Sequence, residues 1–415
     1  MPFPILGGKS PVIAAFSVTN SCRFNDGDSA YLNRDLGTPT NADRWTYSLW
    51  VKRSNIGASQ VLLSGGTAND QADFILFRGT DDQLEWQMYH GTDTAKYKTT
   101  RVFRDIASWY HLVFTYDSAN GTAGDRMRIY VNGVEETVFG TEENVDQNTD
   151  SKINAANQHD IGYDSKGAVT SAYFDGYMAE VVFCDGQAYA ASDFGEYDDT
   201  TPNIWKPKDP SGLTFGDNGF YLDFEASGNL GNDANGGTDF TEVNLAAADQ
   251  AVDTPSNNFC VMNSLDNYYM AATFSEGNCK IVTGTSNTAY NTGTFGLTAG
   301  KWYWECETDD NNAYERTGIA SAPATSASHG IGDGTTAFEW GYRYDGSIQN
   351  NNSSSSYGDS YTTDDTIGVA LDLDNNRIYF AKNNTWQDSG DPTVGSGAIS
   401  ITAVASNGSG VYFPA

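Results

Sequence analysis

The feature that most constrains the fold is a succession of short runs in which apolar and polar residues alternate, separated by turn-forming residues. Clear examples are residues 45–51, residues 109–116 and residues 126–131. The last run leads into Asn132-Gly133, a dipeptide that favours the tight turn of a β-hairpin. Because side chains alternate between two faces along a strand, this pattern predicts short strands that each bury one face. The sequence therefore predicts an all-β chain.

The composition agrees with that prediction. The 415 residues include 43 Gly, 24 Tyr, 21 Phe and 9 Trp. Aromatic side chains suit a pleated, half-buried surface, and Gly with Asn and Asp suits the turns between strands. A chain of this length can form two or three domains, each with its own core.

The charge balance excludes one class of partner. The chain has 54 acidic and 23 basic residues, which gives a formal net charge of −31. A field of that sign repels phosphate backbones, so we expect no nucleic-acid binding. No apolar run approaches the roughly 20 residues that cross a membrane, so we expect no membrane insertion. The charge is explained first by solubility and only second by bound divalent cations.

Residues that could carry catalysis are sparse. The four histidines lie in separate segments, and the five cysteines show no CxxC spacing. Glycoside hydrolysis needs two carboxylates on either side of the sugar bond. The nearest candidates are residues 305–307 and 223–225, and neither is followed by a third acid at the required offset. We therefore expect no enzyme, no catalytic residue and no assigned metal ligand. Oxygen-rich loops such as residues 25–28 leave calcium open as a cofactor.

Several separated segments of the first half resemble the laminin G-like, concanavalin A-type jelly roll. The segments are residues 45–52, 109–113, 128–133 and 174–181. Residues 185–188, 193–196 and 205–208 are similar, more narrowly, to the variant found in structural proteins of tailed phages, marine ones especially. This resemblance implies a virion protein.

The second half resembles a SPRY domain. The resemblance rests on residues 300–304, residues 317–320 and residues 365–380. It implies a compact β-sandwich that binds partners through its loops. SPRY domains usually continue with a strand after a segment like Val411–Ala415, where this sequence stops. We expect truncation there in preference to an edge left open for pairing, because exposed edges promote aggregation.

Together these observations predict two β-sandwich domains of jelly-roll type joined by a loop-rich connector. The expected parts are an extended N-terminal arm (1–16), a laminin G-like sandwich (17–224), a Gly/Asn/Asp-rich connector (225–260) and a SPRY-like sandwich lacking its last strand (261–415).

The expected function is non-catalytic binding by a phage virion protein, as a fibre, spike or decoration attached to a host-surface glycan. The alternatives are a purely architectural capsid or tail subunit and, third, a polysaccharide-degrading enzyme. Other virion proteins are the expected partners, in a homo-oligomer on the virion surface that is assembled in the host cytoplasm. Sugar sites pair aromatic faces with polar groups. The candidate ligand-binding residues are therefore Trp86, Tyr89, Trp340 and Trp386.

Overall fold

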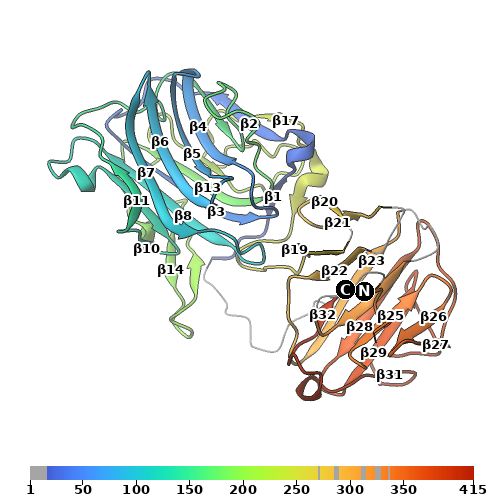
Figure 1. Ribbon diagram of the computed structural model, residues 1–415. Coiled ribbons are helices and arrows are strands. Elements are labelled where there is room, and N and C mark those ends of the chain that lie inside the picture. The colour runs from blue at the N-terminus through green and yellow to red at the C-terminus, as the bar shows by residue number, and fades with distance from the viewer. Residues whose placement is uncertain (1–15, 270–271, 285–288, 310–314, 323–328, 335–336) are drawn as a thin grey trace. The chain divides into compact units, whose positions relative to one another are not determined.

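The computed structural model describes residues 16–269, 272–284, 289–309, 315–322, 329–334 and 337–415 (Figure 1). Apart from Phe16, the expected N-terminal arm lies outside the described residues. The chain divides into an N-terminal unit, which ends at Phe259 and also includes residues 275–278, and a C-terminal unit formed by most of the remainder. Each unit is a β-sandwich of its own.

The N-terminal unit contains two eight-stranded antiparallel sheets. The first sheet has, in spatial order, β10 (Val134–Glu135), β9 (Met127–Val131), β8 (Tyr110–Asp117), β3 (Arg44–Arg53), β13 (Gly176–Asp185), β1 (Ser21–Phe24) and β18 (Gln250–Ala251), with β16 (Phe220–Leu222) paired to β13. The second sheet has, in spatial order, β11 (Phe139–Glu143), β7 (Asp93–Val102), β6 (Gln83–His90), β5 (Gln71–Phe77), β4 (Gln60–Ala68), β12 (Gln158–Ile161), β2 (Tyr31–Asp35) and β17 (Thr241–Val243).

Aromatic side chains fill the space between these two sheets. Trp45 on β3 meets Trp86 on β6, with ring centroids 5.1 Å apart. Tyr116 on β8 stacks on Trp45 at 5.5 Å. These rings belong to one continuous core of buried residues. Burial of such large side chains supplies most of the favourable free energy of folding, which explains why the aromatic positions alternate so regularly in the sequence.

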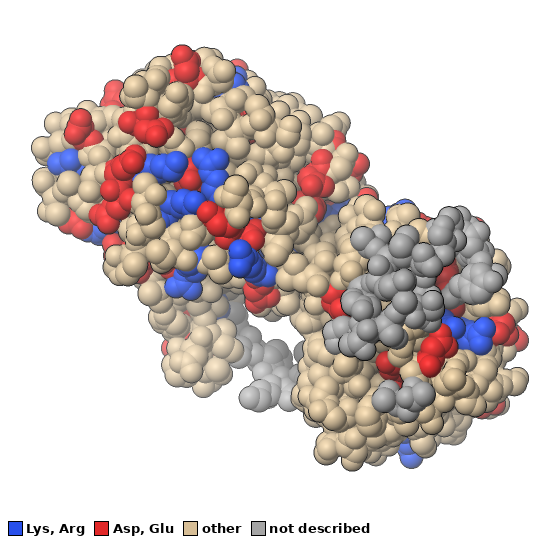
Figure 2. Space-filling view, viewed as in Figure 1, with Lys and Arg blue, Asp and Glu red and all other residues tan. Residues whose placement is uncertain are grey.

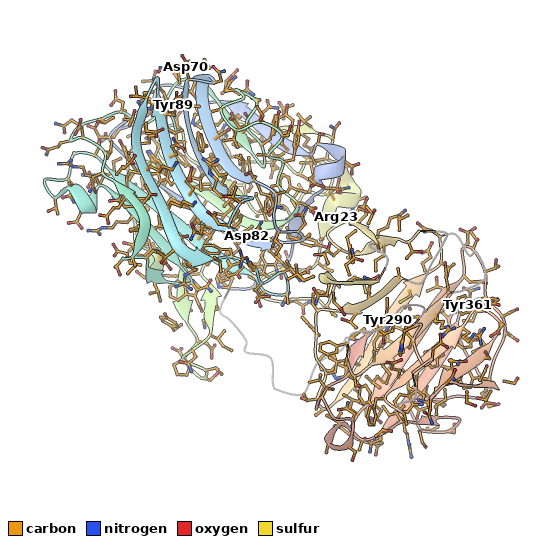
Figure 3. The ribbon with its side chains drawn as sticks, in the orientation of Figure 1. Arg23, Asp70, Asp82, Tyr89, Tyr290 and Tyr361 are labelled. Carbon is orange, nitrogen blue, oxygen red and sulfur yellow. The ribbon has the colours of Figure 1, made fainter. Side chains whose placement is uncertain are left out.

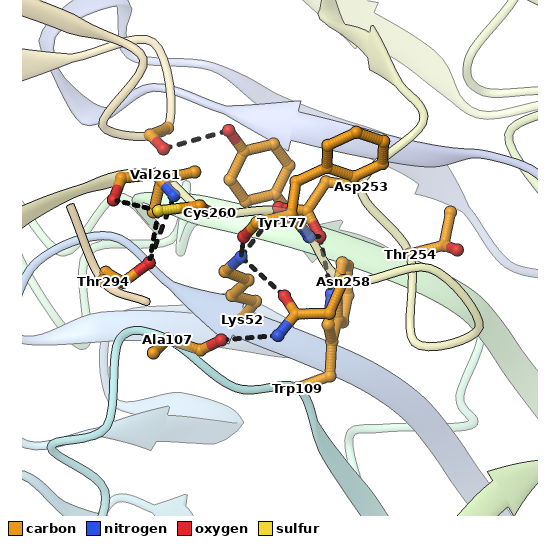
Figure 4. Close-up of polar contacts among 12 residues, drawn as sticks. Lys52, Ala107, Trp109, Tyr177, Asp253, Thr254, Asn258, Cys260, Val261 and Thr294 are labelled. Atoms are coloured by element: carbon orange, nitrogen blue, oxygen red, sulfur yellow. Dashed lines mark hydrogen bonds and ion pairs between the residues drawn. The ribbon is translucent and has the colours of Figure 1, made fainter. Parts of the chain in front are cut away.

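The segment expected as a connector adds strands to the N-terminal sandwich. Its β17 pairs with β2, and its β18 pairs with β1. Beyond β18, Asp253 lies against the buried Lys52, which is 1% exposed (Figure 4). The Lys52 ammonium donates to Asp253 Oδ2 at 2.7 Å, to Asn258 Oδ1 at 2.8 Å and to the Phe259 carbonyl at 2.9 Å. All three of its donors are therefore satisfied, as a buried charge requires.

A bulge interrupts β13 between Ala179 and Val182 in its pairing with β3. Glu180 occupies the bulge with φ of 48°, in the left-handed region that a glutamate seldom adopts. Its side chain is 6% exposed, and its Oε2 accepts a hydrogen bond of 2.7 Å from the Tyr221 hydroxyl. Burial raises the pKa of Glu180 to about 8, because desolvation penalises the carboxylate.

The C-terminal unit packs two five-stranded sheets. One contains β23 (Lys301–Glu307), β28 (Thr366–Asp372), β29 (Arg377–Lys382) and β30 (Thr385–Trp386), with β31 (Ile399–Ser400) paired to β29. The other contains β27 (Ser353–Ser356), β26 (Ser347–Asn350), β25 (Glu339–Arg343), β24 (Arg316–Ala320) and β32 (Phe413–Pro414). A second core, which includes Ile367, Val369 and Phe380, lies between them.

Three two-stranded sheets complete the strands described. They pair β14 (Gly195–Tyr197) with β15 (Trp205–Pro207), β19 (Met262–Tyr269) with β22 (Ala289–Gly293), and β20 (Thr273–Ser275) with β21 (Lys280–Val282). Helical structure in the described residues is limited to five 3₁₀ turns, η1 (Asp26–Asp28), η2 (Ala123–Asp125), η3 (Ala191–Asp193), η4 (Ala247–Asp249) and η5 (Val404–Ser406). Across these same residues, no helix has the length and apolar character needed to cross a membrane. The prediction of an all-β fold with two sandwiches is confirmed.

We expect Lys52→Ala to lower the free energy of unfolding of the N-terminal unit by about 3–5 kcal/mol, because it leaves Asp253 buried without its cation. Chemical denaturation monitored by circular dichroism measures this change. Arg101→Ala is the matched control, since Arg101 pairs with Glu136 at the surface and its loss should cost less than about 1 kcal/mol. Equal effects from the two variants would contradict the structural role assigned to Lys52.

Glu180→Gln should alter how stability depends on pH. The pKa of Glu180 is raised from 4.5 to about 8 in the folded protein, so the protonated side chain contributes stability that is complete below pH 4.5 and is lost as pH rises through 8. Between these values the wild type should lose about 1.4 kcal/mol per pH unit relative to Glu180→Gln. Urea denaturation of both proteins at pH 5, 6.5 and 8 measures the difference. A difference that does not change with pH would show that Glu180 is ionised in the fold.

Candidate functional site

A cavity of about 160 Å³ opens on the outer face of the first sheet of the N-terminal unit. Strand β8 contributes Thr115 and Asp117, and β9 contributes Arg128 and Tyr130. The remaining lining residues are Asn120 and Asp125 from the intervening loop and Ala188, Tyr189 and Ala190 from the segment after β13. The cavity thus combines two aromatic rings with carboxylate, amide and guanidinium groups.

Strand register explains why these side chains share one face. Thr115 pairs with Arg128 across the β8–β9 hairpin, and Val113 pairs with Tyr130. The residues between them, such as Phe114 and Ile129, point into the core. With a period of two residues, the polar set must face outward when the apolar set is buried.

The turn between β9 and β10 has the geometry that its sequence predicts. Asn132 and Gly133 adopt φ of 49° and 80°, as a type I′ turn requires. A Cβ added to Gly133 would lie 2.5 Å from the Trp205 ring, so a larger residue cannot be accommodated there. The turn and the close approach of Trp205 therefore fix the position of β9 beneath the cavity.

Ion pairs order the charged side of the cavity. Arg128 contacts Asp125 Oδ1 at 2.7 Å, and Arg44 contacts both oxygens of Asp117 at 3.2 Å. The hydrogen bond that Arg128 donates to Asp125 raises the pKa of Arg128 above its usual value. Asn120 Oδ1 accepts a hydrogen bond of 2.9 Å from the Thr122 amide, which orients the Asn120 side chain. Each guanidinium is matched by a carboxylate, so the lining carries no unmatched positive charge.

Tyr189 forms a wall of the cavity that is held from three sides. Its carbonyl accepts from the Thr115 hydroxyl at 2.7 Å, and its amide donates to Thr46 Oγ1 at 2.9 Å. Its hydroxyl accepts from the Thr214 amide at 3.1 Å. A ring fixed in this way loses little conformational entropy when a ligand packs against it.

A buried serine–histidine pair lies on the same sheet and cannot act as a nucleophile–base pair. His111 Nε2 lies 2.9 Å from Ser48 Oγ, and His111 Nδ1 accepts from Trp205 Nε1 at 2.9 Å. Because Nδ1 is the acceptor, the proton of the neutral ring sits on Nε2 and faces Ser48. Burial lowers the pKa of His111 to about 3. The pair is therefore structural.

The buried Glu180 is also closed to a sugar. The cavity beside it, lined by Ser48, Trp50 and Lys208 among others, has a volume of about 10 Å³. That is room for a single water molecule. A carboxyl group with a raised pKa is a feature of general acids, but here it has no space for a substrate.

The residues that the sequence suggested as ligand contacts are not brought together. Trp86 is 0% exposed and packs in the core, so it presents no surface to a ligand in this structure. Tyr89, on the same strand, faces the opposite side and is half-buried against Phe74 on the outer surface (Figure 3). Their separation of three residues places them on opposite faces of β6.

The two candidates of the C-terminal unit lie in different sheets. Trp340 on β25 is 5% exposed and packs edge-on against Tyr412, so it belongs to the core of this unit. Trp386 on β30 is half-buried and lies beside Tyr379, with ring centroids 6.4 Å apart. Of the four candidates, Tyr89 and Trp386 keep accessible surface.

Basic and acidic side chains are interspersed on the face of the N-terminal unit shown in Figure 2. On this unit Lys98 pairs with Asp81, and Arg104 pairs with Asp82. Among the described residues, no group of three or more His, Cys, Asp or Glu side chains is placed to hold a metal ion.

The sequence did not single out the cavity residues, for a physical reason. Thr115, Asp117, Arg128 and Tyr130 could have been grouped from the alternation within the hairpin. Tyr189 could not have been added to this group, because it lies about 60 residues further along the chain and no local pattern specifies where its segment packs.

Comparison with known proteins finds two domain families. Residues 25–191 match the Concanavalin A-like lectin/glucanases superfamily, and residues 301–398 match the SPRY domain. A curated relative, the ATP-dependent RNA helicase DDX1 of Xenopus laevis, is 32% identical over 90 residues, which is 22% of this chain and 11% of the helicase. The chain thus spans about a tenth of the length of that relative.

Solved structures show weaker likenesses. A putative carbohydrate binding protein from Bacteroides ovatus is 19% identical, with a TM-score of 0.37, over 55% of this chain and 58% of that one. The SPRY domain of human HERC1 is 22% identical, with a TM-score of 0.22, over 32% of this chain and 76% of that one. On the two family matches, the chain carries a concanavalin A-like domain followed by a SPRY domain.

Proposed function

We propose that this protein binds a carbohydrate without cleaving it, through the cavity on its concanavalin A-like domain, and that it does so on the surface of a phage virion. The observation that carries the proposal is the meeting of Tyr130 and Tyr189 with Asp117, Asn120 and Asp125 around one opening. Aromatic rings pack against the C–H face of a sugar, and carboxylate and amide groups accept and donate hydrogen bonds to its hydroxyls.

The size of the cavity supports a single sugar residue as the bound unit. Its volume is about 160 Å³, whereas pockets for drug-sized ligands run to about 300–1,000 Å³. One ring of an extended glycan would enter, and the rest of the glycan would remain on the surface. Such a site suits the end or a side branch of a polysaccharide.

The charges of the cavity favour a neutral sugar. Arg128 is paired with Asp125, and Asp117 is paired with Arg44, so no cation is left to attract an anionic group. The chain as a whole carries −31, which repels sulfated or carboxylated glycans at low salt. Binding therefore rests on ring packing and hydrogen bonds.

The place on a virion is supported by the similarity of residues 185–208 to structural proteins of tailed phages. On this proposal the protein is a homo-oligomer that contacts other virion proteins. Mass spectrometry and gold labelling of purified particles test this part separately. A protein found in particles that binds no glycan would instead be an architectural subunit.

Asp125→Asn should weaken binding of a neutral oligosaccharide by about tenfold or more, and Asn120→Ala by about twofold to tenfold, because a hydrogen bond between neutral groups contributes about 0.5–1.5 kcal/mol. A hydrogen bond to a charged group contributes about 1.5–3 kcal/mol, and 1.4 kcal/mol is tenfold in affinity. A panel of neutral hexaoses, measured by isothermal titration calorimetry, provides the ligand and the reference affinity.

Asp199→Asn is the matched control for these variants, because Asp199 is an exposed aspartate outside the cavity. Its affinity should equal that of the wild type. Thermal unfolding of each variant establishes that the sandwich is intact. If Asp125→Asn and Asn120→Ala bind every hexaose as the wild type does, the cavity is not the sugar site.

The purified protein should release no reducing ends from laminarin, agar or capsular polysaccharide over several hours. Both carboxylates of the cavity are held in ion pairs with arginine, and the protonated Glu180 has no room for a sugar. A colorimetric assay of reducing ends measures this. Release that disappears in Asp125→Asn or Glu180→Gln would establish an enzyme instead.

A further inference from the structure

The SPRY domain carries aromatic side chains on the solvent side of one sheet. In the sheet of β23, β28, β29 and β30, Trp302 and Trp304 point into the core together with Val369. The alternate residues must therefore point outward. Across the sheet, Tyr303 pairs with Ala370, which pairs with Tyr379.

The next set of residues paired across the same strands is mostly small. Glu305 pairs with Gly368, which pairs with Ala381, and Ala381 pairs with Trp386. The face thus has a floor of glycine and alanine between aromatic side chains that come from its two edges. Small residues in the middle leave the rings of Tyr303 and Trp386 standing above the sheet.

The two rings form a corner. Their centroids are 6.2 Å apart, and their planes meet at 68°. Both side chains are half-buried and keep accessible surface, whereas Tyr379 behind them is 1% exposed. Tyr379 packs edge-on against Trp386 at 6.4 Å and so supports that ring from below.

Glycine at position 368 is required for this arrangement. A Cβ at Gly368 would lie 2.6 Å from the Tyr303 hydroxyl, so any larger residue would push Tyr303 away. The Tyr303 hydroxyl donates to Glu305 Oε1 at 2.5 Å, and burial raises the pKa of Tyr303 above its usual value. The ring is thereby held across β28 with an exposed carboxylate at its end.

We propose that Tyr303, Trp386 and Glu305 form a second carbohydrate-binding site, an open platform for a neutral polysaccharide chain. The corner of two rings offers C–H packing to two faces of a sugar, and the exposed Glu305 carboxylate keeps capacity to accept hydrogen bonds from hydroxyls. An open sheet face of this kind suits an internal stretch of an extended chain, which passes over the surface.

The charged residues on this face indicate which charge a ligand can carry. On this face Lys301 pairs with Asp372, and Arg377, which is next to Asp372 on β29, donates to the Gly395 carbonyl at 3.2 Å. Glu305 adds a negative charge, which disfavours anionic polysaccharides and nucleic acids. Among polysaccharides, a neutral chain therefore fits this face better than an anionic one.

This site shares with the proposed function only the choice of carbohydrate as ligand, and it stands on a different domain. The test is therefore carried out in the full-length Asp125→Asn/Asn120→Ala protein, whose cavity site is removed. The probes are the hexaoses of β-1,4-glucose, β-1,3-glucose and β-1,4-xylose, with hexaproline as a peptide probe. Isothermal titration calorimetry measures the affinity and the number of sites.

We expect residual binding of at least one hexaose at one site per chain. Trp386→Ala and Tyr303→Ala, added to the same protein, should each weaken it at least tenfold. Tyr303→Phe, which keeps the ring, should weaken it less than Tyr303→Ala. Lys301→Ala is the matched control on the same face and should leave the affinity within twofold.

The proposal is overturned if no hexaose binds the cavity variant, or if Trp386→Ala and Tyr303→Ala bind as well as their parent. Binding of hexaproline in place of the hexaoses would also overturn it and would identify a peptide site. If Trp386→Ala does not fold, Glu305→Gln replaces it, because Glu305 is exposed and unneeded by the core. Loss of the cavity site alone leaves this result unaffected, so the two sites succeed or fail separately.

Discussion

The N-terminal sandwich depends on the burial of a single ammonium group, that of Lys52. A buried lysine is tolerated only when its charge and its three donors are matched. The matching groups all come from residues 253–259, about 200 residues further along the chain. The fold of the first domain is therefore incomplete until this segment has returned to β3. Trp109, whose Nε1 donates to Asp253 Oδ1 at 2.9 Å, ties the same carboxylate to the loop before β8.

The same return of the chain covers one edge of each sheet. An uncovered edge strand exposes unpaired backbone groups and invites pairing with other chains. Strand β18 pairs with β1, and β17 pairs with β2, so residues that read as a Gly- and Asn-rich connector protect two edges. Their composition reflects short strands joined by tight turns. The groups that accept hydrogen bonds from Lys52 and the two edge strands thus belong to one continuous segment, residues 241–259.

Much of this fold could be predicted from the sequence, because alternation and turn chemistry act locally. The hairpin at Asn132-Gly133 is an example, with both residues in the backbone region that the dipeptide predicts. The inward orientation of Trp86 could also have been predicted, since Leu84 and Met88 lie on the same face of the strand and are apolar. What could not be predicted is which distant segment covers an outer face. The cavity exists because Tyr189 packs beside β8, and the Trp386 platform exists because Gly368 lets Tyr303 cross β28.

The two proposed sites share a physical constraint. In a chain with a net charge of −31, cations near both of them are paired with carboxylates, as in the pairs Arg128–Asp125 and Lys301–Asp372. Long-range attraction is then unavailable for recognition, and repulsion between the protein and an anionic surface extends over a Debye length. Contacts that act at short range must supply the affinity. Rings fixed by hydrogen bonds and packing, such as Tyr189 and Tyr303, meet this requirement because little conformational entropy remains to be lost when a ligand arrives.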